Sequence, residues 1–144
     1  MENGSAFQVR GNQFQRNGAG LLLWSKWEPK WCELLPENRT IHHWDIEGNT
    51  LTRNGTGIYI AADRYHGIRA MPPATCGRPE CRPHDNQIRK NDIQDNRIGI
   101  ELANADRTHI EGNILNRNVE SNIRQDDARE NVIRNNLGAV GGYL

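Results

Sequence analysis

One short run of residues combines the side chains that proton transfer requires. The run is Asp63, Arg64, Tyr65 and His66, and it directly follows an apolar, strand-like segment. A carboxylate or an imidazole can take a proton, and a guanidinium can stabilise the negative charge that results. The same residue types are also common in solvated loops. We therefore treat Asp63, Arg64 and His66 as candidate catalytic residues, and Tyr65 as a candidate binding residue.

The three cysteines form a second group with chemistry of its own. Cys76 and Cys81 are separated by four residues of a proline-rich stretch, and a disulfide between them would suit an exported protein. The alternative is a zinc site with Cys32, Cys76, Cys81 and His84 as ligands, although this spacing matches no zinc ribbon. Free, buried cysteines are the third interpretation.

Tryptophan is concentrated in one part of the chain, since all four tryptophans lie between residues 24 and 44. Trp24, Trp27 and Trp31 are candidates to stack on sugar rings, because an aromatic ring offers apolar area with a polar edge. The alternative is a satellite core in which all four tryptophans, Trp44 included, pack on the apolar run Leu21–Leu23.

A repeat must position these residues. The spacing Asn-x-Φ-x-x-Asn, where Φ is apolar, occurs in five non-overlapping copies, and a repeat decides the architecture. The copies are 12–17, 49–54, 91–96, 113–118 and 131–136. Apolar and polar residues alternate within a unit, which predicts strands. The bare unit, from Asn91 to Asn113, is too short for a solenoid repeat that contains a helix. It fits the coils of a parallel β-helix, which stack at roughly 4.8 Å.

The asparagines predict the corners of the coils. Asparagine tolerates the left-handed backbone conformation of a tight corner, and it can form an amide ladder with the same residue one coil away. Val9, Ile46, Ile88 and Ile110 precede the first asparagine of their copies by three residues, and Ala128 precedes Asn131 in the same way. Outward residues of the later copies, such as Glu101, predict a solvated face.

The first two units, from Asn12 to Asn49 and from Asn49 to Asn91, are longer than the bare unit. We assign their extra residues to two insertions, 25–43 and 63–85. Both insertions leave after the same strand of consecutive coils, and equivalent positions of stacked coils are neighbours. The sequence therefore predicts that the two insertions emerge side by side on one flank and that the candidate site lies there.

The repeat resembles that of a known group. Runs such as NQIRKNDIQDNRIGIEL and NTLTRNGTGIYI are similar to the right-handed parallel β-helix superfamily, which includes pectate-lyase-like enzymes, alginate epimerases and NosD-type periplasmic accessory proteins. The resemblance implies an all-β, right-handed, single-stranded parallel β-helix of about five coils. It also implies acidic polysaccharides as the substrate class, with a lyase or epimerase using a base and a cation. The alternative is a non-catalytic NosD-type accessory or structural module that acts by interaction or metal handling.

The composition of the chain argues against several classes of protein. Apolar residues make up 35% of the chain and its mean hydropathy is −0.83, but the periodic apolar positions argue against disorder. Lys plus Arg equals Asp plus Glu at 18 each, so charge gives no case for nucleic acid. No apolar run approaches the length of a membrane span. We expect no cofactor beyond zinc at the cysteines or calcium at Asp126 and Asp127 as weak alternatives.

The length of the chain predicts one domain, residues 1–144. Neither end offers an obvious cap, which solenoids normally need, so we expect either a piece of a longer β-helix or self-association at the open ends. A polysaccharide or oligosaccharide is the expected ligand. The first residues, MENGSAFQVR, are not a signal peptide, and an extracellular or periplasmic location is favoured for the parent protein.

Overall fold

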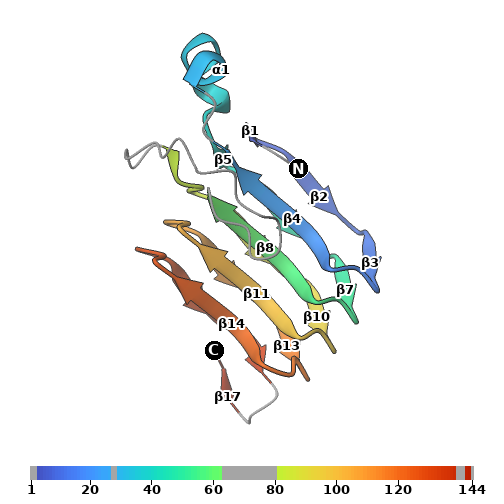
Figure 1. Cartoon of the computed structure of the whole chain (residues 1–144). Helices are drawn as coiled ribbons and strands as arrows, with labels where there is room; N and C mark the ends of the chain where they lie inside the picture. The colour runs from blue at the N-terminus through green and yellow to red at the C-terminus, as the bar shows by residue number, and fades with distance from the viewer. Residues whose placement is uncertain (1–2, 27–28, 63–80, 139–141, 144) are drawn as a thin grey trace.

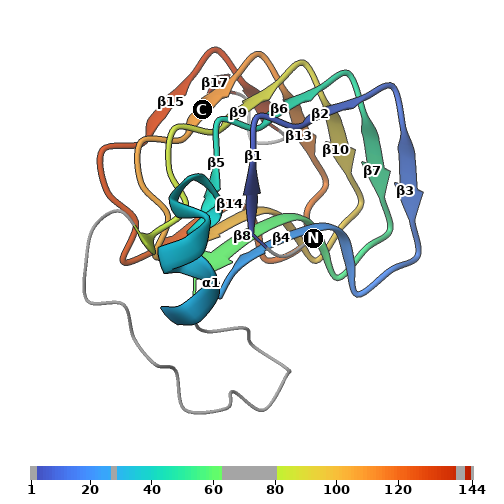
Figure 2. The same cartoon turned by 90° about the horizontal axis from the view of Figure 1, so that it is seen from above.

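The chain folds into stacked parallel strands, as the repeat predicts. The computed structural model describes residues 3–26, 29–62, 81–138 and 142–143. Among these residues every strand pairing is parallel except that of β16 with β17. Figure 1 shows the strands side by side, and Figure 2 shows the coils behind one another. The predicted all-β parallel β-helix is confirmed.

Each turn of the chain adds one strand to each of three main sheets. The four-stranded sheet contains β4 (Ala19–Ser25), β8 (Thr56–Ala62), β11 (Ile98–Ala103) and β14 (Ser121–Asp126). The five-stranded sheet contains β2 (Gln8–Arg10), β6 (Asp45–Glu47), β9 (Gln87–Arg89), β12 (His109–Glu111) and β15 (Val132–Arg134). The six-stranded sheet contains β3 (Gln13–Gln15), β7 (Thr50–Thr52), β10 (Asp92–Gln94), β13 (Ile114–Asn116), β16 (Leu137–Gly138) and β17 (Gly142–Tyr143). A short pair joins β1 (Gly4–Ser5) to β5 (Ile41–His42).

The core consists of rows of identical or similar apolar residues, one residue from each strand of a sheet. One row runs through β2, β6, β9, β12 and β15 and contains Val9, Ile46, Ile88, Ile110 and Ile133. A second row contains Phe14, Leu51, Ile93 and Leu115. Ile93 is fully buried, as its place in the repeat predicts. Because each strand contributes only one or two inward residues to this core, a modest apolar fraction is sufficient.

Asparagine ladders join the coils at their corners. The backbone N–H and Nδ2 of Asn91 donate to Oδ1 of Asn113 at 2.9 and 3.0 Å, and Nδ2 also donates to the carbonyl of Ile46 at 2.9 Å. Asn49 bonds to Asn91 in the same way. The ladder therefore satisfies polar groups that the fold buries, which is the condition for burying them at low cost.

The left-handed corner residue precedes the asparagine, so this detail of the prediction is wrong. Arg53 and Asp95 have φ of 57°, and Gly48 has φ of 66°. Each of them stands directly before a ladder asparagine. The corner separates two tasks: the preceding residue reverses the backbone, and the asparagine side chain bonds to the next coil.

The alignment of the fifth copy is also wrong. Asn136, not Asn131, continues the ladder of Asn113, because Oδ1 of Asn136 accepts the backbone N–H of Asn113 at 2.9 Å. Asn131 belongs to a different corner, where its Oδ1 accepts the N–H of Thr108 at 2.7 Å. Neighbouring corners of one coil both use asparagine, and the distance between these corners equals the distance between the two asparagines of a copy. This distance alone therefore fits either alignment.

The two insertions leave and return side by side, as predicted. β4 and β8 end together, with Ser25 beside Ala62, and the chain rejoins the coils where His42 and His84 form a parallel bridge. The first insertion contains helix α1 (Pro29–Leu34) and the 3-10 helix η1 (Pro36–Asn38); α1 lies beyond the end of β4 in Figure 1. No helix within the described ranges is long and apolar enough to cross a membrane.

Candidate functional site

The candidate site is the corner at which both insertions rejoin the coils. His42, His84 and Asp106 occupy equivalent positions there, because His84 forms parallel bridges to both neighbours. We call this region the rejoining corner. Its members are His42, His43, Arg82, His84, Asp85, Asp106, Arg107 and Asp127.

Three imidazoles lie together where the first insertion returns, and two of them are stacked. The rings of His42 and His84 are parallel within 8°, with centroids 5.0 Å apart, and His43 stands edge-on, 5.0 Å from His42 and 6.1 Å from His84. Nε2 of His42 lies 2.7 Å from the carbonyl of Glu37, and its Nδ1 lies 2.7 Å from Nδ1 of His43. A carbonyl only accepts, so a neutral His42 carries its proton on Nε2 and accepts a bond from His43.

The next coil extends this group with an aspartate and an arginine. Nδ1 of His84 donates to Oδ2 of Asp85 at 2.6 Å, and Arg107 binds both oxygens of Asp85 at 3.0 and 3.1 Å. The bond from Arg107 is the main reason that the pKa of Asp85 is lowered to about 2. Burial is the main cause that lowers the pKa of His84, and the bond to Asp85 opposes it. His84 is therefore neutral at pH 7, and its Nε2 carries a lone pair that is able to accept a proton.

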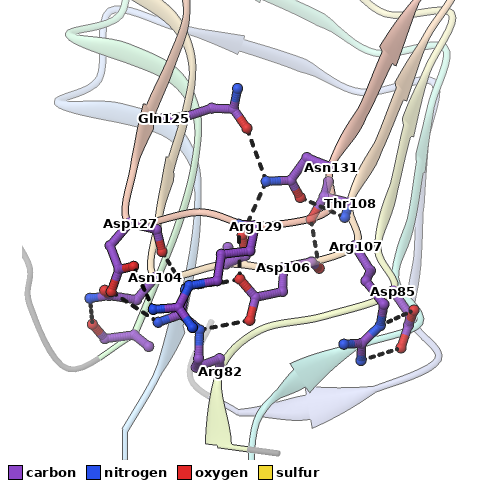
Figure 3. Close-up of polar contacts among 12 residues, drawn as sticks. Arg82, Asp85, Asn104, Asp106, Arg107, Thr108, Gln125, Asp127, Arg129 and Asn131 are labelled. Carbon is purple, nitrogen blue, oxygen red and sulfur yellow. Dashed lines mark hydrogen bonds and ion pairs between the residues drawn. The ribbon is translucent and has the colours of Figure 1, made fainter. Parts of the chain in front are cut away.

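A second network fixes the return of the second insertion (Figure 3). Arg82 binds both carboxylate oxygens of Asp106, at 2.7 and 2.9 Å, and one oxygen of Asp127 at 3.1 Å; it also donates to the Asp127 carbonyl. The bond to Asp106 raises the pKa of Arg82, and Arg82 lowers the pKa of Asp127. Arg82 follows Cys81, which is disulfide-bonded. The network thus ties the end of the insertion to the next two coils.

These bonds limit what the corner can do chemically. A general base works best when its pKa lies near the operating pH. Asp85 and Asp127 have lowered pKa values and are held by arginines, and Asp106 is bound by Arg82. The three carboxylates therefore orient and join the coils. The imidazole of His84, whose pKa is lowered by burial, is able to accept a proton at pH 7.

The candidate catalytic residues lie outside the described residues. These residues are Asp63, Arg64 and His66, together with the binding candidates Tyr65 and Trp27 and the cysteine Cys76. The side chain of Trp31 also lies outside them. The catalytic hypothesis for the second insertion stays a prediction.

The remaining candidates have known surroundings. Trp24 stands on β4 beside Ala61 of β8 and is half-buried. Cys32 is free and buried, whereas Cys81 is disulfide-bonded, so the proposed pairing of Cys76 with Cys81 stays a prediction. Trp44 joins the main core, not a satellite core, and donates from Nε1 to the carbonyl of Gly4 at 2.9 Å.

Sequence reasoning missed Arg82, Asp106 and Arg107. A signal for two of them was present, because Asp106 and Arg107 follow His84 and Asp85 by one bare repeat unit, the distance from Asn91 to Asn113. Extending the repeat alignment beyond the strands would have placed them beside the histidines. Nothing in the spacing indicates Arg82, since it lies in the returning arm of an insertion.

The comparisons with known proteins give one partial match. The model of the family described as periplasmic copper-binding protein (NosD) matches residues 81–139, about two fifths of the 144 residues. The matched stretch contains β9 to β16 and most of the rejoining corner. No curated protein and no solved structure matches the chain.

The described residues do not fit a copper ion. Imidazole nitrogens suit copper, and the stacked histidines are the nearest candidate ligands. The rings of His42 and His84 are parallel, so their in-plane lone pairs cannot converge on one ion, and both nitrogens of His42 are already bonded. Within the described ranges no group of three His, Cys, Asp or Glu residues could hold a metal. The disulfide at Cys81 likewise removes that thiolate from the predicted zinc site.

Proposed function

Because the chain is a parallel β-helix repeat protein whose residues 81–139 match the NosD family, we propose that it is a non-catalytic accessory module. It acts by interaction, and its working surface is the flank at which the two insertions leave and return. The partner is a protein that contacts the rejoining corner and the two insertions that return there.

The proposal rests on the ion pairs that the acidic residues of the rejoining corner form. Asp85, Asp106 and Asp127 are each bound by an arginine from a different coil. The pair of Arg82 and Asp106, whose side chains are largely buried, holds the returning end of the second insertion against the next coil. The ion pairs also lower the pKa values of Asp85 and Asp127. An anion with a lowered pKa is a weak base, so these two carboxylates are poorly suited to proton transfer. The coils thus form a rigid support from which two insertions leave side by side. Such a surface suits recognition of a partner, because loops on a solenoid commonly carry binding residues.

Two observations support a location outside the cytoplasm. Cys81 is disulfide-bonded, and disulfides persist mainly in oxidising compartments. The family that matches residues 81–139 is described as periplasmic. Both support a periplasmic or extracellular module.

Site-directed crosslinking tests the interaction. A photoreactive amino acid replaces His43, which is exposed at the corner, and in a matched control it replaces Arg117, which is exposed at another corner. In the producing cell, crosslinking from position 43 to one defined protein, and none from position 117, is the expected result. Equal crosslinking from both positions, or crosslinking from position 117 alone, would place the working surface elsewhere.

An elimination assay tests the non-catalytic part. Lyase action on a uronate polymer creates a double bond that absorbs ultraviolet light, so a panel of such polymers reports turnover directly. We expect no absorbance change. Turnover that disappears when residues 63–80 are replaced by a short turn, while the coils stay folded, would make the protein an enzyme and overturn the proposal.

Non-catalytic polysaccharide binding to the same flank is the second candidate function. The observation in its favour is Trp24, which is half-buried beside the point where the second insertion leaves β8 and offers a ring for stacking. Acidic oligosaccharides should then change the tryptophan fluorescence, and Trp24→Ala should remove most of the change. An unchanged response in that variant would exclude Trp24 as the stacking residue.

A further inference from the structure

A polar pocket lies on the outer face of the four-stranded sheet, the sheet that faces the viewer in Figure 1. Its volume is about 270 Å³. The pocket is formed by successive coils, because its walls come from β4, β8, β11 and β14 and the turn before β11. Its lining includes Tyr59, Glu101 and Arg124 from the strands and Arg97 from the turn.

The floor of the pocket contains a carboxylate that is out of reach of water on most sides. Tyr59, Glu101 and Arg124 are neighbours in one row across β8, β11 and β14. Glu101 is 4% exposed, although its outward position predicted a solvated side chain. Within the described part of the chain its ion-pair partner is Arg124 at 3.6 Å, which is longer than a hydrogen bond. The carboxylate oxygens of Glu101 therefore keep capacity to accept hydrogen bonds, and a hydroxyl group is a suitable donor.

The rim of the pocket carries two guanidinium groups that share one acceptor. Arg97 and Arg124 both donate to Oε2 of Glu120, at 2.7 and 2.9 Å. The Glu120 side chain is 41% exposed, and exposed ion pairs contribute little to stability. A carboxylate that enters from solvent can therefore take the place of Glu120 at small cost, and two arginines provide charge-assisted donors for it.

We propose that this pocket binds a small hydroxy acid. The carboxylate of the ligand replaces Glu120 at Arg97 and Arg124, and hydroxyl groups at its other end donate to Glu101. The volume is just below the usual range of about 300–1,000 Å³ for small-molecule sites, so the ligand has the size of one sugar-like unit. Two arginines at the rim disfavour a metal cation. The pocket lies outside the rejoining corner, and this inference is independent of the proposed function.

Matched ligands test both ends of the pocket. Gluconate has the carboxylate and the hydroxyls, sorbitol has the hydroxyls without the carboxylate, and hexanoate has the carboxylate without the hydroxyls. Isothermal titration of the full chain should show binding of gluconate, and at least about tenfold weaker binding of the other two, since one charge-assisted hydrogen bond exceeds the roughly 1.4 kcal/mol that a factor of ten requires. Equal binding of all three, or no binding of gluconate, would overturn the proposal.

Variants distinguish a binding role from a structural one. Arg97→Gln should weaken gluconate binding about tenfold or more, and Arg97→Lys should restore part of it. Glu120→Gln should strengthen binding several-fold, because it removes the internal competitor for the arginines. Arg97 is half-exposed, so thermal melting should change little. Unchanged affinity in Arg97→Gln, or weaker binding in Glu120→Gln, would contradict the geometry. If Arg97→Gln failed to fold, Glu120→Gln alone would decide.

Discussion

The asparagine ladder predicts that one substitution has very different costs at two positions. In Asn91→Ala, four side-chain contacts are lost: two that Nδ2 donates, to Asn113 and to the carbonyl of Ile46, and two that Oδ1 accepts from Asn49. The buried N–H of Asn49 and the carbonyl of Ile46 lose these partners. At about 1–3 kcal/mol for each of these two unsatisfied buried groups, we expect a loss of about 2–6 kcal/mol.

The matched control is Asn12→Ala, at the exposed start of the same ladder. Asn12 donates from Nδ2 to Asn49 at 3.2 Å and to the carbonyl of Arg10 at 3.0 Å. Oδ1 of Asn49 keeps the backbone N–H of Asn12 after the substitution, so it is not left without a donor. We expect a loss below about 1 kcal/mol. Urea unfolding followed by circular dichroism measures both values, and equal losses in the two variants would refute the ladder as the source of stability.

Three further predictions concern packing, pH and thiols. Gly57→Ala should cost about 1–3 kcal/mol, because a Cβ there would lie 2.6 Å from the Gly99 carbonyl oxygen, whereas Gly18→Ala meets nothing within 4 Å and should be near neutral in urea unfolding. The pKa of Asp85 is lowered from 3.8 to about 2, so its bond to Arg107 stabilises the fold above pH 4. The stability difference between the protein and Arg107→Ala should therefore shrink as the pH falls from about 4 to about 2; a constant difference would contradict the pairing. Cys32 is free and buried, so mass spectrometry should find it blocked by a thiol reagent only after unfolding, and rapid blocking of the native protein would contradict its burial.

The scaffold could be predicted from the sequence because it rests on period and residue type. Apolar residues recur at fixed distances from asparagines, and Ile46, Ile88 and Ile110 consequently stack in one row. The insertions could be placed on one flank for the same reason. The period does not give a unique alignment where neighbouring corners use the same residue at the same spacing. Asn131 was therefore assigned to the wrong corner.

The candidate site was less predictable because its contacts cross from an insertion to the coils. The position of Arg82 depends on the path of the returning chain, which no repeat encodes. The burial of Glu101 was missed for a related reason. Alternation assigns a residue to the outer face of a strand, but it does not tell whether that face is covered. The sequence therefore does not predict the pocket at Arg97 and Arg124, which only the structure shows.

Successive coils stack in parallel and bring the two insertions back to the same corner. Nuclear Overhauser contacts in isotopically labelled protein test this directly. We expect backbone contacts of His84 with His42 and with Asp106, both of which are distant from it in the sequence. A well-dispersed spectrum of the folded protein in which His84 shows neither contact would rule out this stacking of the coils.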